Sequence, residues 1–375
     1  MMEMESMFRI RDPLHGTISL SATEEKLLDC CQMQRLRGIR QLATAYLVYP
    51  GANHTRFEHS IGTLFLADRM CREMGMGEER IAKARAAALL HDIGHVAFSH
   101  ESEAVLRGKL GTHEEVGRRM MLHGEVADVL SGDFSAREIA DLCDTPLGSV
   151  ITSDIGADRM DYLLRDSHYT GVAYGVIDTQ RICTSVSLGK KGLLIRERGL
   201  EAAESLLVAR VTMFSTVYLH KTVRIASRML QQAIMLALED GTLVEDDFLC
   251  FGDSQAIDAI GTSPNAREYA ARIKKRRLFK KAYSVPMAKM RVMARKAEEE
   301  LSCACGCPVL IDVPVLSAKT DIMLEKKNGK TLPLSRESEL VSALVEMQSR
   351  RLEALVMCDE RHVAKVARAA KRLFG

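Results

Sequence analysis

The sequence of 375 residues has no apolar run close to the roughly 20 residues that a membrane-spanning helix needs. Its acidic, methionine-rich start also lacks the basic segment and the apolar stretch of a signal peptide. These absences argue against a membrane partner and favour a cytoplasmic protein. In that compartment the ten cysteines are expected to be reduced thiols, because disulfides rarely persist there.

A large net charge is also lacking: it is +2 at neutral pH, so the overall charge indicates no class of partner. No internal repeat, low-complexity segment or Pro/Ser-rich linker stands out. With 47% hydrophobic and 27% charged residues, the composition is typical of a soluble protein with one large domain or two.

Two local features depart from this even composition. Cys303, Cys305 and Cys307 form a cluster without the second cluster that common structural zinc sites have, so we favour unbound thiols near a turn, with a metal site as the alternative. Residues 267–296 hold twelve Lys or Arg and one acidic residue, Glu268. A solvated helix face is the simplest interpretation of this run, and a polyphosphate-binding patch or nonspecific nucleic-acid contact are the alternatives.

Apolar residues recur three and four positions apart over most of the first 240 residues, which predicts a mainly α fold built as a helical bundle. A turn or strand is expected at residues 13–20 and a hairpin at 186–195. The predicted helices cover residues 27–42, 60–74, 79–90, 113–122, 136–142 and 201–229.

The pattern changes after about residue 240. We expect a core over residues 1–240, a helical basic segment over 241–300, and a small α+β appendage over 301–375. In the appendage, strands are predicted at 309–313, 322–324 and 355–357, a turn at 328–329, and helices at 337–350 and 363–373.

A candidate metal site stands at the end of an Ala/Leu-rich helical run, where His91 and Asp92 offer an imidazole nitrogen and a carboxylate oxygen side by side. His59 is another candidate ligand, and a helix over residues 154–162 would bring Asp158 and Asp161 near one face. His59, His91, Asp92 and Asp158 then make a four-ligand site for Mn, Mg, Fe, Zn or Ni, with room for water and a phosphate ester. Nine of the eleven histidines precede residue 169, a clustering that scattered structural histidines would not show.

Several motifs in this region occur together and in a recognisable order. They cover residues 12–16, 34–42, 49–62, 89–100, 112–114, 158–166 and 218–221. In combination they resemble the HD-domain deoxynucleoside triphosphate triphosphohydrolases, in particular the branch that includes the SAM- and HD-domain enzymes. The resemblance spans about residues 8–225 and implies an HD-domain helical bundle that hydrolyses a dNTP to a deoxynucleoside and inorganic triphosphate.

The resemblance also implies roles for the histidines. The metal held by the four ligands named above would polarise the α-phosphate and lower the pKa of a bound water. His113 matches the family's catalytic histidine, with Glu114 beside it, while His95 and His100 match histidines that face the phosphates and the leaving 5′-oxygen. An imidazole suits proton delivery to a leaving alkoxide near neutral pH.

Substrate contacts follow from the same resemblance. Cations match the positions that hold the triphosphate, and their fork-like arginine donors suit phosphate oxygens. Tyr162 and Asp166 match contacts to the sugar edge, and Gln41 matches a residue that reads the 3′-hydroxyl. Leu219 stands where close relatives have a polar residue near the base, so no base preference carries over. The matching cations are Arg56, Arg159, Arg210 and Lys221.

A regulatory site is implied as well. Asp29, Gln34 and Arg37 match positions that hold an activating guanine nucleotide, GTP or dGTP, at a subunit interface of regulated relatives. Arg277 and Lys280 belong to a stretch that resembles the one reaching its phosphates. The expected assembly is then a homo-oligomer, either a dimer or a tetramer.

Two other functions stay open. An HD site also serves nucleotide monophosphatases, phosphodiesterases and alarmone hydrolases, which need the same Lewis acid. A nucleotide sensor or nucleic-acid-binding protein would instead keep the site as a remnant and use the basic run.

Overall fold

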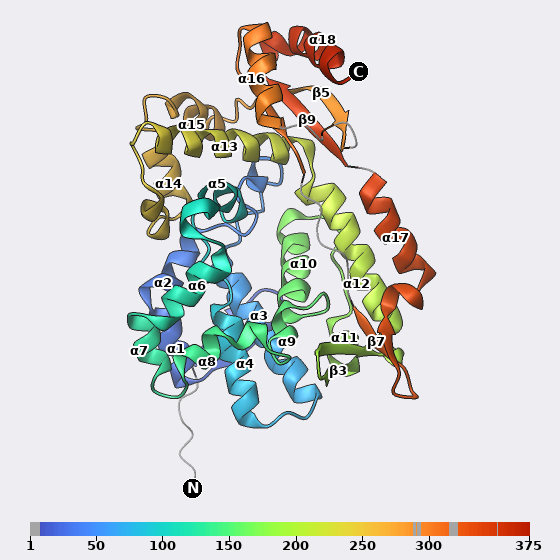
Figure 1. The fold of residues 1–375 in the computed structure, drawn as a ribbon. Coiled ribbons are helices and arrows are strands. Elements are labelled where there is room, and N and C mark those ends of the chain that lie inside the picture. The colour runs from blue at the N-terminus through green and yellow to red at the C-terminus, as the bar shows by residue number, and fades with distance from the viewer. Residues whose placement is uncertain (1–7, 288–289, 291–293, 315–321, 351) are drawn as a thin grey trace.

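The computed structural model describes residues 8–287, 290, 294–314, 322–350 and 352–375, and it confirms the mainly α fold (Figure 1). The helices up to residue 239 are α1 (Ala22–Asp29), α2 (Cys31–Arg35), α3 (Arg56–Glu73), α4 (Glu78–Leu90), α5 (His100–Leu110), α6 (His113–Leu122), α7 (Glu125–Leu130), α8 (Ala136–Ala140), α9 (Ser149–Thr152), α10 (Ala157–Thr170), α11 (Thr179–Ser185), α12 (Leu200–Met213) and α13 (Lys221–Glu239). The later ones are α14 (Asp253–Ile260), α15 (Arg267–Lys274), α16 (Ala294–Cys305), α17 (Glu339–Arg350) and α18 (Val363–Phe374).

Three small sheets accompany the helices. Their strands are β1 (Phe8–Asp12), β2 (Gly16–Leu20), β3 (Val186–Gly189), β4 (Gly192–Arg196), β5 (Lys280–Pro286), β6 (Val309–Asp312), β7 (Met323–Glu325), β8 (Thr331–Pro333) and β9 (Glu353–Cys358). Strands β1 and β2 pair as an antiparallel hairpin, and the other sheets run in the orders β3-β4-β7-β8 and β5-β9-β6. The predicted hairpin at 186–195 and the predicted C-terminal strands are therefore confirmed.

Local sequence signals explain where several helices begin and end. Ser21 caps α1 and Thr112 caps α6, each in a capping box in which a Glu three residues later bonds back to the cap backbone. Helix α10 ends at Gly171, whose φ of 72° lies in the left-handed region that glycine adopts without strain. The starts of α1 and α6 and the end of α10 are thus fixed by their own sequence.

The predicted helix over residues 27–42 is wrong over most of its length. Helix α1 ends at Asp29, the backbone turns at Cys30 (φ −57°, ψ 140°), and α2 covers only five residues before a short 3₁₀ turn. Arg40 then lies in an extended segment that bridges Thr55. The apolar spacing of this stretch reflects burial of Leu36 and Ile39 in the core and not one continuous helix.

The predicted helix over residues 201–229 is interrupted. Helix α12 ends at Met213, a π-helical turn covers Phe214–Tyr218, and α13 starts at Lys221. His220 caps α13 by accepting the backbone N–H of Thr222 at 3.2 Å. Extra residues in the wider π turn are common near functional sites, and this one sets the direction of Tyr218.

The sequence predicted a helical basic segment, and the structure corrects this, because the basic run is helical only in part. Helix α15 ends at Lys274, and Lys280–Pro286 form strand β5, which pairs antiparallel with β9. Arg276 between them has a φ of 53°, which ends the helical path. Residues 288–289 and 291–293 of the run lie outside the described residues.

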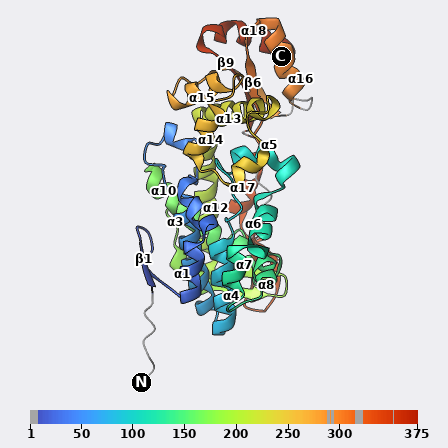
Figure 2. The same cartoon turned by 90° about the vertical axis from the view of Figure 1, so that its left-hand side faces the viewer.

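Strands from distant parts of the chain share the two larger sheets. Strand β7 pairs in parallel with β4, and β5 pairs with β9. The β4–β7 pair crosses both boundaries that we drew, at residues 240 and 300, and the β5–β9 pair crosses the one at 300. The domain bounds stay a prediction. In both views α16, α18 and β9 lie at one end of the molecule and α4 and α7 at the other (Figure 1, Figure 2).

Within the described residues, no single helix has the length and hydropathy of a membrane span, although the bent pair Glu197–Tyr218 and Lys221–Glu239 passes that test when taken together.

Candidate active site

Three helices bring the predicted metal ligands together. His59 lies in the first turn of α3, His91 and Asp92 follow the last residue of α4, and Asp158 lies in the first turn of α10. The Nε2 atom of His59 is 3.1 Å from Oδ1 of Asp158 and 3.7 Å from Oδ2 of Asp92. The Nε2 atom of His91 is 3.4 Å from Oδ1 of Asp92 and 3.9 Å from Oδ1 of Asp158. One ligand atom from each of His59, His91 and Asp158 lies within 4.8 Å of the others.

The hydrogen bonds of the two imidazoles show that these residues fit a metal ion. His59 donates from Nδ1 to Asp161 at 2.8 Å, and His91 donates from Nδ1 to the carbonyl of Ala88 at 2.7 Å. Each ring therefore keeps its Nε2 lone pair for the space between the carboxylates, as metal-binding histidines do. The buried Nε2 of His91 has no hydrogen-bond partner among the residues that the structure describes, and a bound cation would supply one.

The charges around this space favour a divalent cation. Burial opposes ionisation of Asp92, but Arg56 and the neighbouring histidines outweigh it and hold the pKa of this carboxyl well below its usual range. Burial likewise opposes ionisation of Asp158, and the contact with His59 lowers its pKa. Burial lowers the pKa of His59, yet the surrounding carboxylates raise it to about 10. Such a field of carboxylates at one point stabilises a positive charge.

Asp161 orients the ring of His59 by accepting the hydrogen bond from its Nδ1. It is fully buried, and besides His59 it contacts Nε2 of His15 at 2.7 Å and the guanidinium of Arg165 at 2.8 Å and 2.9 Å. Gly62 allows this approach, because a Cβ there would lie 1.9 Å from Asp161 Oδ1. The sequence had placed Asp161 on the same face as Asp158, and the structure shows that it orients a ligand.

The three predicted catalytic histidines form a second cluster with a carboxylate that we did not predict. The rings of His95 and His113 stack with centroids 4.0 Å apart, and that of His100 meets both edge-on. Glu103 accepts from Nδ1 of His113 at 2.9 Å and lies 3.4 Å from Nδ1 of His100. Glu114 lies 3.4 Å from Nε2 of His113. The spacing of Glu103 three residues after His100 on a helix is the signal that was available in the sequence.

The histidines of this cluster differ in charge. Burial lowers the pKa of His113, but its bond to Glu103 and the nearby carboxylates outweigh this, so the pKa is raised. Burial and the positive charge of Arg56 hold the pKa of His95 well below its usual range. The pair therefore offers a charged proton donor beside a neutral imidazole, which suits proton transfer to a leaving group.

The loop between the HD motif and α5 is strained. Phe98 and Ser99 have φ values of 63° and 51°, in the left-handed region that non-glycine residues rarely adopt. Asp253, from α14, accepts the backbone N–H of Phe98 at 2.8 Å and that of Arg40 at 3.0 Å. Ser99 accepts from Nε of Arg56 at 3.0 Å. A residue far along the chain thus fixes the path of this loop.

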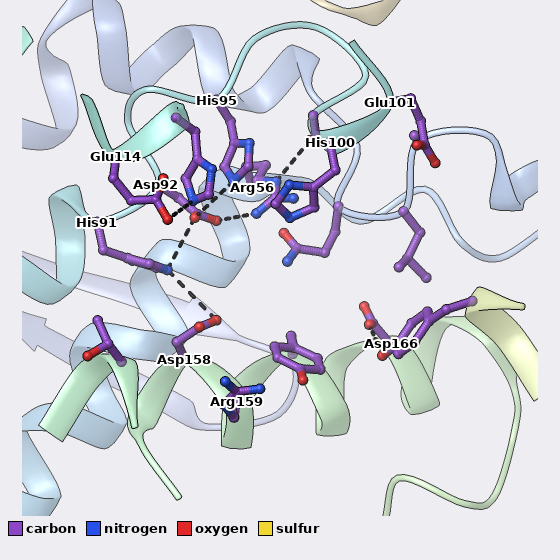
Figure 3. A pocket seen from close by; sticks show the side chains of 18 of the residues that line it. Arg56, His91, Asp92, His95, His100, Glu101, Glu114, Asp158, Arg159 and Asp166 are labelled. Carbon is purple, nitrogen blue, oxygen red and sulfur yellow. Dashed lines mark hydrogen bonds and ion pairs between the residues drawn. The ribbon is translucent and has the colours of Figure 1, made fainter. Parts of the chain in front are cut away.

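A cavity of about 610 Å³ opens onto both clusters, a size that suits a nucleotide (Figure 3). Helices α4, α5, α6, α10, α12 and α13 contribute to its wall. Most of the predicted substrate and catalytic residues line it, namely Gln41, Arg56, His91, Asp92, His95, His100, His113, Glu114, Asp158, Arg159, Tyr162, Asp166 and Arg210.

Two arginines of the cavity share one carboxylate. Asp154 lies 2.9 Å from Nη2 of Arg159 on α10 and 3.0 Å from Nη1 of Arg210 on α12. This shared anchor holds both guanidinium groups at the same part of the wall, where they suit a polyanion.

The residues predicted to contact the sugar, Gln41, Tyr162 and Asp166, all line the cavity, and their role stays a prediction. Asp166 accepts the hydroxyl of Tyr218 at 2.6 Å and contacts Nε2 of His54 at 2.7 Å. The amide oxygen of Gln41 is buried and has no hydrogen-bond partner in the described part of the chain. A hydroxyl donor on a ligand is the partner that this oxygen lacks.

Other predicted residues lie outside this cavity. Lys221 is exposed at the start of α13 and does not line it. Arg37 donates from Nε to Gln34 at 2.9 Å beside α1, whereas Lys280 is at the start of β5, near the other end of the molecule in Figure 1. Within this chain they do not form one site, and their regulatory role stays a prediction.

The cysteine cluster shows no sign of a metal site in the described part of the chain. Cys305 and Cys307 are buried in a small apolar core with β6 and β9, and Cys303 is exposed. No group of potential metal ligands among the described residues includes any of the three.

Family models and known proteins match the chain. The model of the HD domain matches residues 56–163, and the model of the HD-associated region matches residues 177–375. An uncharacterized protein of Methanocaldococcus jannaschii is 42% identical over 277 residues, which are 72% of this chain and 58% of that protein. A deoxynucleoside triphosphate triphosphohydrolase of Bos taurus is 27% identical over 62% of this chain and 48% of its own length. The chain thus spans about half the length of these relatives.

Solved structures share the fold. A hypothetical protein from Aquifex aeolicus has a TM-score of 0.81 at 28% identity, with 97% of this chain and all of that chain covered. A phosphohydrolase from Bacteroides thetaiotaomicron has a TM-score of 0.74 at 24% identity, over 95% of this chain and all of its own. The chain therefore belongs to the HD-domain family, with an HD domain over residues 56–163 followed by the HD-associated region over residues 177–375.

Proposed function

We propose that this protein is a metal-dependent phosphohydrolase that cleaves dNTPs to a deoxynucleoside and inorganic triphosphate. The observation that carries the proposal is that one cavity of about 610 Å³ is lined by metal-ligand candidates, by a histidine cluster, by three arginines and by the predicted sugar contacts. The Bos taurus relative, which bears the name of this activity, supports it.

The reaction transfers the α-phosphoryl group to water: the water oxygen bonds to phosphorus, the bond to the 5′-oxygen breaks, and the leaving alkoxide takes a proton. A divalent ion held by His59, His91, Asp92 and Asp158 supplies the Lewis acid for this attack. His113, whose raised pKa favours its charged form, is suited to deliver the proton.

The chain's own cations and polar groups hold the substrate. Arg159 and Arg210, anchored on Asp154, face the triphosphate, and Arg56 lies beside Asp92 at 2.6 Å. At the sugar, the unpartnered oxygen of Gln41 accepts the 3′-hydroxyl. The Tyr162 ring against the C2′ face leaves no room for a ribose hydroxyl, which favours dNTPs over NTPs.

The test is to incubate the purified protein with each dNTP and each NTP, with Mn or Mg and with or without GTP, and to separate the products by ion-exchange chromatography. We expect a deoxynucleoside and intact triphosphate from dNTPs, and no turnover after chelation of the metal. Release of single phosphates would instead support another HD phosphohydrolase.

Two variants distinguish the metal centre from a binding role. His91→Ala and Asp92→Ala should each lower kcat by about a thousandfold or more, since the Lewis acid and its water are lost. Titration of a nonhydrolysable dNTP shows whether binding survives. Activity that persists in both variants, with circular dichroism unchanged, would refute the proposed role of the site. Neutralising the charges of residues 272–281 tests the sensor alternative, because catalysis should survive it.

Activation by GTP or dGTP, assembly as a homo-oligomer and a cytoplasmic location are further parts of the proposal. The exposed positions of Asp29 and Arg37 on one side and of Arg277 and Lys280 on the other are compatible with a nucleotide held between subunits. The GTP arm of the assay tests the first of these.

A further inference from the structure

The proposed function leaves the base of the nucleotide without a recognising residue. Leu219, which replaces a polar residue of close relatives, does not line the cavity. Glu101 does line it, as the second residue of α5. Figure 3 shows Glu101 at the end of the cavity that is opposite His91 and Asp158.

A buried pair of hydroxyls fixes this carboxylate. Oε1 of Glu101 accepts the Ser227 hydroxyl at 2.8 Å, and Oγ of Ser227 is 3.0 Å from Oγ1 of Thr44. Ser227 and Thr44 are 7% and 1% exposed, so they form a rigid support. Within the described part of the chain no hydrogen bond is made to Oε2 of Glu101, which leaves that oxygen for a ligand in the cavity.

The surroundings of Glu101 suit a base and not a phosphate. Ala45 and Val223 pack in one apolar cluster with Leu42 against it, and all three line the cavity. They come from the two segments that hold the supporting hydroxyls. Asp166, a predicted sugar contact, accepts the hydroxyl of Tyr218, and both residues line the same cavity as this apolar cluster. A flat, mostly apolar ring with polar edges fits such a place.

Glu101 brings a carboxyl group to this end of the cavity. Burial raises the pKa of Glu101, the Ser227 bond and His100 oppose the rise, and Asp312 adds to it. Asp312 itself is paired with Arg224 at 2.6 Å. Among the described residues no salt bridge involves Glu101, so above its raised pKa it presents an uncompensated carboxylate that attracts N–H donors.

We propose that Glu101 selects the base of the substrate by accepting hydrogen bonds from its pairing edge. This inference rests on the proposed function, because it assigns the base of the same dNTP. Guanine offers two adjacent donors, N1–H and the 2-amino group, while adenine and cytosine offer one amino group each. Thymine offers a single N3–H between two carbonyl oxygens, which repel a carboxylate. The expected order is therefore dGTP first and dTTP last.

The experiment measures kcat/KM for the four dNTPs at pH 8. GTP is present at one fixed concentration, so that differences in activation do not affect the ranking of the four substrates. We expect the wild-type protein to favour dGTP over dTTP. Glu101→Gln keeps the shape but offers an amide donor to thymine O4, so the ratio of dGTP to dTTP should fall about tenfold or more. Ser227→Ala should lower the ratio of dGTP to dTTP less, since it removes only the hydrogen bond that holds the Glu101 carboxylate in position.

Two controls separate base recognition from damage to the site. Inhibition by inorganic triphosphate should be equal in wild type and Glu101→Gln, because it occupies only the phosphate end. Glu79→Gln, a side chain 80% exposed on α4, should leave the ranking unchanged. Turnover of dNTPs with a ratio that Glu101→Gln does not change would overturn this inference alone. An absence of dNTP turnover by the wild type would overturn the proposed function and the inference with it.

Discussion

Glu103 contacts two of the three histidines in the catalytic cluster. A carboxylate bonded to an imidazole stabilises the charged form of that imidazole, and this is how Glu103 raises the pKa of His113. At the level of single residues, the proton donor therefore depends on a partner that has no contact with the metal ligands named above.

We predict that Glu103→Gln moves the alkaline limb of the pH–rate profile to lower pH. The charged form of His113 is present below its pKa and is lost as pH rises through it. Removal of the carboxylate lowers that pKa, so the donor is lost earlier on the way up. The measurement is kcat from pH 5.5 to 9.5, with His113→Ala as the control, where a loss of about 10²–10⁴-fold is expected. An unmoved alkaline limb in Glu103→Gln would show that another group delivers the proton.

Some residues of the candidate site could be predicted from the sequence and others could not. Histidines are few, so the ligands and the cluster stood out once their spacing on helices was considered. Glu103 was missed, and Asp161 was noted only as a neighbour of Asp158 on one helix face, because the chain has 50 acidic residues and their partners become neighbours only after folding. His15 and Asp161 are 146 positions apart, a contact that no local pattern indicates.

Packing between elements holds the site through glycines. A Cβ on Gly94, in the turn that carries the HD motif, would lie 2.1 Å from the carbonyl oxygen of His113 and 2.2 Å from the backbone nitrogen of Gly117. These are backbone atoms of α6, which cannot move as a flexible side chain does. The turn and α6 therefore approach each other only because residue 94 has no side chain.

We predict that Gly94→Ala lowers the free energy of unfolding by about 1–3 kcal/mol and lowers kcat, since α6 must move and carry His113 with it. Thermal denaturation and the dNTP assay measure the two effects. Gly108→Ala in α5 is the matched control: no atom lies within 4 Å of a Cβ there. That change should stabilise the protein by up to about 1 kcal/mol and leave activity unchanged. Equal behaviour of the two variants would rule out close packing as the reason for Gly94.

Whole elements were predicted best where the apolar spacing was regular, as in α4 and α6, and α6 also begins with a capping box. The break within residues 27–42 was missed because buried turns can repeat apolar residues as helices do. The π turn before α13 was missed for a similar reason, since its residues continue the helical pattern. Strand β5 was not predicted, because the lysines and arginines around it suggested a solvated helix face.

At the scale of the molecule, the part after residue 240 completes the part before it. The inner face of α13, including Met229 and Ile234, is buried against α14 and α15 in a second apolar core. Strand β7 extends the sheet of β4, and Asp253 anchors the loop that carries Phe98.

We predict that a chain ended after residue 240 neither folds cooperatively nor binds the metal. It would expose the apolar face of α13 and lose the Asp253 anchor, so it should aggregate or bind a hydrophobic dye such as ANS. Size-exclusion chromatography and metal titration provide the measurements. Asp253→Asn in the full chain is the control, with the fold kept and kcat lowered. A soluble truncated chain that binds the metal as tightly as the full chain would contradict this view.

The sequence separation of 155 positions between Phe98 and Asp253 also affects folding during synthesis. During synthesis the HD motif leaves the ribosome long before α14 exists, so the strained loop has no anchor for much of that time. A nascent chain can form α3, α4 and α10 without an ordered catalytic cluster. If the proposed function holds, activity therefore begins only once the chain is nearly finished, and unfinished chains stay inactive.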